Sequence, residues 1–222
     1  MTKNEVIVID VGISNLFNVK RAFESIGANV IITDAKDEIL NASKLVLPGV
    51  GAFGAGIKNL KQKNLIQPIR DYAKSGKPLF GICLGMQMLF SQSEEHGFWE
   101  GLGIIPGKVR AFQPPVADGE VGFKIPQMGW NYIKRNPELQ SSINTDSWEN
   151  TALQGLGDDP YMYFVHSYVG VPDSVADCLA YTFYGHDRFC SVVQRDNVTG
   201  CQFHPERSGE IGIRILENFL KA

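Results

Sequence analysis

The chain has 222 residues, of which 44% are hydrophobic, and a formal net charge of −3. This length and composition suffice to bury a full core, so we expect one compact domain spanning residues 1–222. The weak negative charge, with Lys and Arg scattered along the chain, argues against nucleic acid as a partner. The first residues lack a secretion signal, and no segment approaches the roughly 20 apolar residues of a membrane span, which predicts a cytoplasmic protein without membrane contact.

The four cysteines predict neither disulfides nor a structural metal site. Cys83, Cys178, Cys190 and Cys201 form no close pair such as C-x-x-C, and none lies near a histidine at zinc-finger spacing. Cys178, Cys190 and Cys201 lie in hydrophobic runs without special neighbours, and we assign them to packing.

The first half of the chain alternates short apolar runs with amphipathic stretches, which is typical of strand and crossover-helix units. In chain order it predicts a strand at 6–9, a helix at 15–26 ended by Gly27, strands at 30–33 and 44–47, the glycine-rich segment 48–51, a helical region to about residue 75, a strand at 78–83 and a helix at 84–91. The sequence therefore predicts an α/β fold with a largely parallel sheet.

The second half predicts several short strands, so the sheet is expected to become partly antiparallel there. These strands are at 107–112, 132–134, 161–169, 176–183, 189–195 and 200–204. A final amphipathic helix is expected at 210–220, with Ile211, Ile215, Leu216, Phe219 and Leu220 on one side. Residues 139–157 are polar and weakly patterned, and we interpret them as a surface excursion.

The segment around Cys83 is typical of a nucleophile elbow. An apolar strand ends in Gly81-Ile-Cys83-Leu-Gly85 and leads directly into a helix, with glycines where side chains would collide in the turn. The helix N-terminus favours an anionic sulfur, and a thiolate attacks carbonyl carbon well. The alternative is a buried cysteine at a strand end, which would be preferred for a lone Cys without the two glycines.

A cysteine nucleophile needs a proton shuttle, and His204 has an orienting partner in sequence. In Gln202-Phe-His204-Pro-Glu206 the histidine and glutamate are two residues apart at a predicted strand end, so in extended conformation both side chains leave the same face. Glu206 could then hold the imidazole in one tautomer and stabilise its charge. A surface His-x-Glu is common, but the elbow cysteine elsewhere in the chain favours the functional interpretation.

The segment Pro48-Gly49-Val50-Gly51 is a candidate for stabilising an oxyanion. It follows a strand of the same predicted parallel sheet, and its glycines let backbone N–H groups approach a substrate. Such segments are often simple turns, but the position of this one, one strand before the elbow, favours the oxyanion interpretation.

With GICLGMQ, PGVGAFG and QFHPERS, the chain resembles the class I glutamine amidotransferases over nearly its whole length. DVGISN, PQMGWN and YFVHSY make it most similar to the glutaminase subunits of imidazole glycerol phosphate synthases. The resemblance implies a three-layer, flavodoxin-like fold with a largely parallel, partly mixed central sheet. It also implies hydrolysis of glutamine to glutamate and ammonia, without metal or organic cofactor.

The resemblance implies roles for individual residues. Cys83 is the expected nucleophile, His204 the acid and base, and Glu206 its orienter. The expected oxyanion and substrate contacts are Gly49, Val50, Gly51, Gln87, His166, Ser167 and Tyr168, with the peptide at Val50 and Gly51 turning for activity. Interface positions are expected near Asn15, Phe53, Arg207 and Tyr168.

The implied partner is a cyclase subunit with a (β/α)8 barrel, which forms a heterodimer with this chain and receives its ammonia for histidine biosynthesis. Ala52, Ser14 and the length of segment 139–159 depart from the usual family pattern, which leaves open an alternative, an ammonia-supplying subunit for surface-sugar amidation. Two other interpretations are disfavoured. A cysteine peptidase of similar fold often has His directly after Cys, where Leu84 stands, and an inactive module would lack part of the Cys-His-Glu set.

Overall fold

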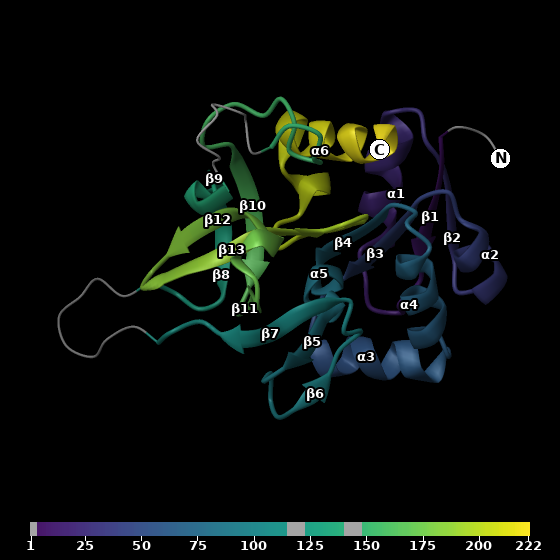
Figure 1. The fold of residues 1–222 in the computed structure, drawn as a ribbon, viewed down its shortest axis with the longest axis horizontal. Helices are drawn as coiled ribbons and strands as arrows, with labels where there is room; N and C mark the ends of the chain where they lie inside the picture. Colours follow the sequence, from purple (N-terminus) through teal and green to yellow (C-terminus); the bar gives the residue numbers. More distant parts are fainter. Residues whose placement is uncertain (1–3, 115–122, 140–147) are drawn as a thin grey trace.

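The structure is a computed structural model that describes residues 4–114, 123–139 and 148–222. Within these residues the strands form a central eight-stranded sheet, a four-stranded sheet and a two-stranded sheet (Figure 1). The central sheet contains, in spatial order, Asn29–Thr33 (β2), Glu5–Ile9 (β1), Leu45–Gly49 (β3), Leu79–Cys83 (β4), Val198–Cys201 (β14), Asp187–Arg195 (β13), Cys178–Tyr184 (β12) and Lys134–Arg135 (β9). The four-stranded sheet contains Tyr168–Pro172 (β11), Ile105–Ala111 (β7), Phe90–Ser93 (β5) and Trp99–Glu100 (β6). The two-stranded sheet contains Tyr161–His166 (β10) and Gln127–Tyr132 (β8).

The central sheet is parallel in its first part and antiparallel in its second, as the sequence predicts. β2, β1, β3, β4 and β14 run parallel, and β13, β12 and β9 continue in antiparallel pairings. The parallel strands are nearly continuous apolar runs because both of their faces are covered by helices. In β1, Val6 and Val8 join one hydrophobic cluster while Ile7 and Ile9 join the other.

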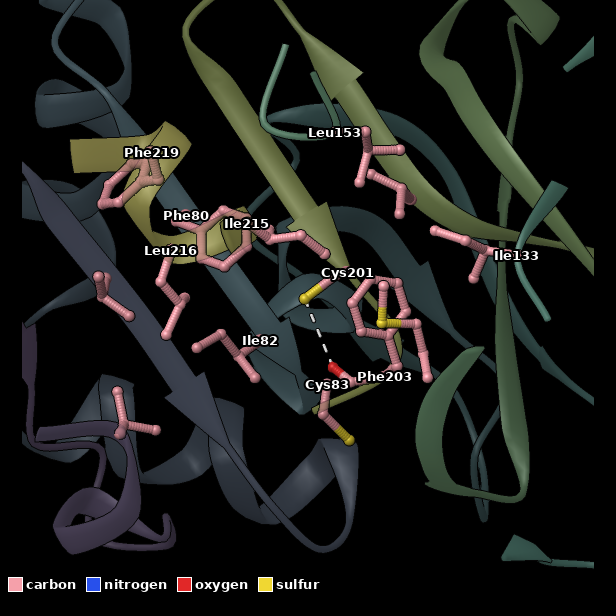
Figure 2. Packing of buried hydrophobic residues seen from close by; sticks show 14 of the residues in the cluster. Phe80, Ile82, Cys83, Ile133, Leu153, Cys201, Phe203, Ile215, Leu216 and Phe219 are labelled. Atoms are coloured by element: carbon pink, nitrogen blue, oxygen red, sulfur yellow. Dashed lines mark hydrogen bonds between the residues drawn. The ribbon is translucent and has the colours of Figure 1, made fainter. Parts of the chain in front are cut away.

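Helices cover both faces of the sheet, which gives the three-layer α/β fold. The helices are Leu16–Ser25 (α1), Lys36–Asn41 (α2), Phe53–Gln62 (α3), Ile66–Lys74 (α4), Leu84–Leu89 (α5) and Gly209–Lys221 (α6). α1 and α6 contribute to the cluster on one face, where Phe80 and Phe219 lie with ring centroids 5.2 Å apart (Figure 2). α2, α3, α4 and α5 contribute to the cluster on the other face.

Several predicted boundaries differ from the structure, each for a reason in the tertiary packing. The helix predicted at 84–91 ends at Leu89, because Phe90 begins β5, which pairs with β7. The strand predicted at 132–134 is divided between β8 and β9, and the one at 161–169 is divided at Ser167 between β10 and β11. In each divided run the two parts pair with strands of different sheets.

The helical region predicted to about residue 75 is two helices, α3 and α4, separated near Asn64, which has a positive φ of 55°. α2, a short and largely exposed helix, was not predicted from the sequence. In α6, Ile211 was expected on the buried side but is exposed; Ile215, Leu216 and Phe219 are buried.

The interpretation of residues 139–157 as a surface excursion is wrong in part: among the described residues Glu149, Asn150 and Gln154 are exposed, but three apolar residues are buried. Residues 140–147 lie outside the described residues. Trp148 and Leu153 are fully buried and Leu156 nearly so, and the Trp148 indole N–H donates to the Leu179 carbonyl at 3.1 Å. Three apolar residues spaced among polar ones gave no clear period, although they anchor the segment against β12.

No helix within the described residues is long and apolar enough to cross a bilayer. The carboxyl ends of β1, β3, β4 and β14 meet at one edge of the sheet. Open α/β sheets bind their ligands at this kind of edge.

Candidate active site

Cys83 stands at the turn between β4 and α5, in a conformation that L-residues rarely adopt. Its φ is 54° and its ψ −110°. A Cβ on Gly85 would lie 1.7 Å from the Leu47 carbonyl oxygen, and one on Gly81 would lie 2.8 Å from the Met86 nitrogen. The two glycines therefore let α5 fold back tightly against β3 and β4, as the elbow motif predicts. In Figure 2 the Cys83 sulfur points away from the labelled core residues.

His204 and Glu206 form the pair that the sequence predicts, but by a different backbone geometry. The His204 Nδ1 lies 2.8 Å from Glu206 Oε1, and both side chains are buried. The strand expected at 200–204 ends at Cys201, and Glu206 lies in a short 3-10 helix, Pro205–Arg207. An extended His-x-Glu is thus the wrong local model; the turn after Pro205 brings the carboxylate to the ring.

The backbone of His204 is anchored on both sides. Its N–H donates to the Tyr163 carbonyl at 2.9 Å, and its carbonyl accepts from Ser208 Oγ at 2.6 Å. Burial lowers the pKa of His204, but hydrogen bonds and charge interactions with Cys83 and Glu206 outweigh burial and raise the pKa to about 10. The ring therefore lies between the sulfur and the carboxylate and carries a proton at neutral pH.

A pocket of about 430 Å³ opens beside Cys83 at the carboxyl edge of the sheet. It brings together most of the residues predicted from the sequence: Cys83, His204, Val50, Gly51, Gln87, His166, Ser167 and Tyr168. Of the other two, Glu206 contacts the pocket through His204, and Gly49 lies at the end of β3, in register with Cys83. Segments far apart in the sequence thus meet at one cavity.

The glycine-rich segment after β3 does not present the Val50 N–H to the pocket. This N–H donates to the Ile13 carbonyl at 3.0 Å. Gly51, with a φ of 91°, allows the sharp change of direction that follows. The loop after β1 therefore holds this peptide, and rotation of the peptide would have to break the bond with Ile13.

His166 is buried beside the pocket and is held on both ring nitrogens. Nδ1 lies 2.9 Å from the Tyr168 carbonyl oxygen, and Nε2 lies 3.1 Å from the side-chain amide of Gln127. Burial and the charge of His204 lower the pKa of His166 to about 4, although the hydrogen bond with the Tyr168 carbonyl raises it. His166 is neutral at physiological pH, and its position explains why the backbone that follows it lines the pocket.

Glu95 lines the pocket and was not recognised in the sequence. It is buried, and its Oε2 accepts the backbone N–H of Phe53 at 2.5 Å. Glu95 lies in a short connection after β5 without a motif, so only its position in the fold reveals it.

Of the expected interface positions, Asn15, Tyr168 and Arg207 line the pocket, and the Arg207 guanidinium lies 4.4 Å above the Tyr163 ring. Phe53 is fully buried, so its side chain cannot contact a partner. The described residues contain no group of three or more His, Cys, Asp or Glu side chains placed to hold a metal ion.

Comparison with known proteins places the chain beside glutamine-using enzymes. The family model "Glutamine amidotransferase class-I" matches residues 7–222. The "Imidazole glycerol phosphate synthase subunit HisH 1" of Legionella pneumophila (strain Lens) is 43% identical, over 98% of this chain and 99% of that protein. The proteins named as subunit HisH in Salinibacter ruber and Sulfurimonas denitrificans are 45% and 42% identical, over 96% and 97% of this chain and 92% and 97% of their own lengths.

Solved structures resemble the fold at low sequence identity. A crystal structure of a glutamine amidotransferase has a TM-score of 0.68 at 17% identity, covering 98% of this chain and 99% of that one. A PurLQS structure from Thermotoga maritima has a TM-score of 0.68 at 19% identity, with 99% of each chain covered. These likenesses bear on the fold alone.

Proposed function

The chain belongs to the class I glutamine amidotransferase family, and from that premise we propose that it is the glutaminase subunit of an imidazole glycerol phosphate synthase. The observation that carries this proposal is full-length identity of 42–45% to proteins of that name, in a chain whose Cys83, His204 and Glu206 lie together at one pocket. The protein hydrolyses glutamine to glutamate and ammonia for histidine biosynthesis in the cytoplasm.

The first half of the proposed reaction forms a thioester. Cys83, as a thiolate, attacks the side-chain amide carbon of glutamine, and its negative charge moves to the carbonyl oxygen. His204, which carries a proton at neutral pH, gives it to the amide nitrogen. The C–N bond then breaks, ammonia leaves, and a glutamyl thioester remains on the sulfur.

The second half releases glutamate. His204 is now neutral and takes a proton from a water molecule, whose oxygen attacks the thioester carbon. The C–S bond breaks, the electron pair returns to the Cys83 sulfur, and glutamate departs. Glu206 accepts the Nδ1–H of His204 throughout, so the other ring nitrogen faces the reacting atoms.

Pocket residues outside the triad bind the substrate in this proposal. Gln87 lies one helical turn after Cys83 on the same face of α5. The carboxylate of Glu95 is suited to the α-ammonium group of glutamine, because it is the acidic side chain that lines the cavity. The segment Gly49, Val50 and Gly51 supplies the oxyanion donor once the Val50 peptide turns away from Ile13.

The proposal includes a partner, because ammonia released into water at neutral pH becomes ammonium and loses its nucleophilicity. We propose a cyclase subunit with a (β/α)8 barrel, docked over the pocket as a heterodimer. An exposed stripe of one methionine and three aromatic residues supports this position: Met128, Trp130 and Tyr132 alternate along β8, and Tyr161 of β10 lies beside them. β10 ends at His166, so the stripe leads directly to the pocket.

The test measures glutamate release by wild type and Cys83→Ala, each with and without a purified barrel cyclase and its ribotide substrate. We expect slow release by the isolated chain, a large increase with the cyclase, and none in Cys83→Ala. Cys178→Ala, which changes a buried cysteine outside the pocket, is the matched control and should keep activity. The surface-sugar alternative gains if the cyclase leaves wild type idle, and turnover by Cys83→Ala would overturn the mechanism.

A further inference from the structure

Gln202 lies beside the reacting sulfur and has no part in the two half-reactions described above. It follows β14, which pairs in parallel with β4 so that Cys201 is opposite Ile82. The next residues along the two strands are Gln202 and Cys83. The Gln202 side chain is fully buried, and its Nε2 lies 3.7 Å from Cys83 Sγ.

The second end of the Gln202 amide is held by Gln87. Gln202 Oε1 accepts from Gln87 Nε2 at 3.0 Å, and the same Gln87 nitrogen donates to the Tyr168 carbonyl at 3.0 Å. Tyr168 O also accepts from His166 Nδ1 at 2.9 Å. The amide of Gln202 thus ends a chain of hydrogen bonds that begins at a backbone carbonyl.

This chain fixes which end of Gln202 faces the sulfur. A backbone carbonyl can only accept, so Gln87 must turn its NH₂ group toward Tyr168. The second N–H of that group then faces Gln202, which must present its oxygen. The NH₂ group of Gln202 is therefore directed at Cys83, and the reverse orientation would place two donors against each other.

We propose that Gln202 is a further catalytic residue, whose amide N–H donates to the Cys83 sulfur and stabilises its negative charge as the thioester breaks. The proposal rests on the glutaminase function above. His204 interacts with the same sulfur, and the Val165 carbonyl lies 3.9 Å from it, but a carbonyl cannot donate to an anion. In a buried site a charge-assisted hydrogen bond is worth more than one between neutral groups.

The two halves of the reaction use this bond differently. In the first half the sulfur gives its charge away, so a donor at the sulfur does not favour the transition state. In the second half the C–S bond breaks, the electron pair returns to sulfur, and a donor there lowers the barrier. Loss of the donor should therefore slow release of glutamate from the thioester more than its formation.

The test compares wild type with Gln202→Met in complex with the cyclase and its ribotide substrate, with glutamine varied. We expect kcat to fall roughly 10- to 100-fold, the cost of a hydrogen bond to a charged group. KM for glutamine should fall with it, leaving kcat/KM within about threefold, because the slow step now follows an accumulating covalent intermediate. Acid quenching and intact-protein mass spectrometry should show the glutamyl thioester as the main steady-state species.

Gln194→Met is the matched control, because it makes the same change on the neighbouring strand β13 away from the pocket. It should leave kcat, KM and the thioester level unchanged. Gln202→Asn, which keeps the amide but withdraws it by one methylene, should show the same signature more weakly, and it replaces Gln202→Met if that variant does not fold.

The outcomes separate this inference from the proposed function. A Gln202 variant with lower kcat/KM and no thioester would indicate displacement of Cys83 and overturn the inference, as would unchanged kinetics. In both cases the wild type still turns glutamine over and the glutaminase function stands. A wild type without turnover in the complex overturns both.

Discussion

His166 illustrates how one buried side chain links the pocket to the rest of the fold. Its ring contacts the aromatic rings of Phe112, Phe164 and Phe189, with centroids 5.0 to 5.7 Å away. A neutral imidazole has a single N–H, and the Tyr168 carbonyl requires it on Nδ1. Nε2 must then accept, so the Gln127 amide has to turn its nitrogen toward the ring in the neutral state.

The low pKa of His166 predicts a loss of stability in mild acid. The unfolded chain takes up a proton on this residue near its ordinary pKa of 6.5, whereas the folded chain does so near 4. The contribution of His166 to the free energy of unfolding is therefore complete above pH 6.5 and is lost as the pH falls toward 4. At pH 5 the loss is about 2 kcal/mol. Urea unfolding of wild type and His166→Gln at pH 7.5 and 5.0 measures how much of the change in unfolding free energy comes from His166.

His166→Gln should show a smaller fall in unfolding free energy between the two pH values, although it is less stable at pH 7.5. Other titrating groups, including His204 with its raised pKa, are common to both proteins and cancel in the difference. Equal falls in the two proteins would mean that His166 is not held neutral by the fold.

At the scale of elements, the strand, elbow and helix around Cys83 depend on close contact between backbones. Gly85 of α5 lies against the Leu47 carbonyl of β3, and Gly81 lies against the first turn of α5. The contact lets Cys83 stand at the edge of the sheet with its sulfur directed toward the pocket. The elbow is thus a packing solution, and in our proposal it also positions the nucleophile.

Gly85→Ala should destabilise the protein by about 3 kcal/mol and abolish cyclase-dependent glutamate release. Its new Cβ would lie 1.7 Å from the Leu47 oxygen, so the backbone of β3 or α5 must move. Gly157→Ala is the control, because a Cβ there meets nothing within 4 Å. It should stay within about 0.5 kcal/mol of wild type in urea unfolding. Wild-type behaviour of Gly85→Ala would show that the elbow tolerates a wider turn.

The element scale also shows what the sequence could predict. The elbow was predictable because its glycines and its strand-to-helix order are local. The His204 and Glu206 pair was predicted with the wrong backbone, since nothing local shows that β14 ends at Cys201. Glu95 and Gln202 are brought to the pocket by contacts with residues distant in sequence, Phe53 and Cys83. Trp148 was missed because a single buried anchor in a polar segment has no period.

At the scale of the whole molecule, the order of the central sheet supports our proposal that residues 1–222 form one domain. β14, from the last quarter of the chain, lies between β4 and β13 and completes the parallel part of the sheet. α6 packs on α1, with Phe219 and Phe23 in edge contact at 6.2 Å. The two ends of the chain thus share one core, because Val6, Val8, Leu216 and Phe219 belong to the same hydrophobic cluster. In Figure 1 the C-terminal helix α6 lies beside α1.

The whole molecule also has a distinct docking side in our proposal. The stripe formed by Met128, Trp130, Tyr132 and Tyr161 lies on the two-stranded sheet of β8 and β10, and Trp130 stacks on Tyr161 with ring centroids 5.7 Å apart. Exposed aromatic side chains gathered in one place are typical of protein interfaces, where they supply most of the binding energy. On the far side of the molecule, the described helix α2 has one exposed large hydrophobic side chain, Leu40.

Trp130→Ala should weaken binding of the cyclase about 30-fold, the effect of removing a central aromatic anchor, and leave the unfolding free energy within about 1 kcal/mol. Stability should hold because Trp130 is about half exposed in the free chain and belongs to neither hydrophobic cluster of the described residues. Leu40→Ala, an exposed apolar change on α2, should leave affinity unchanged. Titration calorimetry with the purified cyclase measures the affinities. At saturating cyclase, Trp130→Ala should recover most glutaminase activity, because the substitution alters docking and leaves Cys83, His204 and Glu206 in place. If Trp130→Ala and Leu40→Ala bind the cyclase with equal affinity, the interface lies on another face of the molecule.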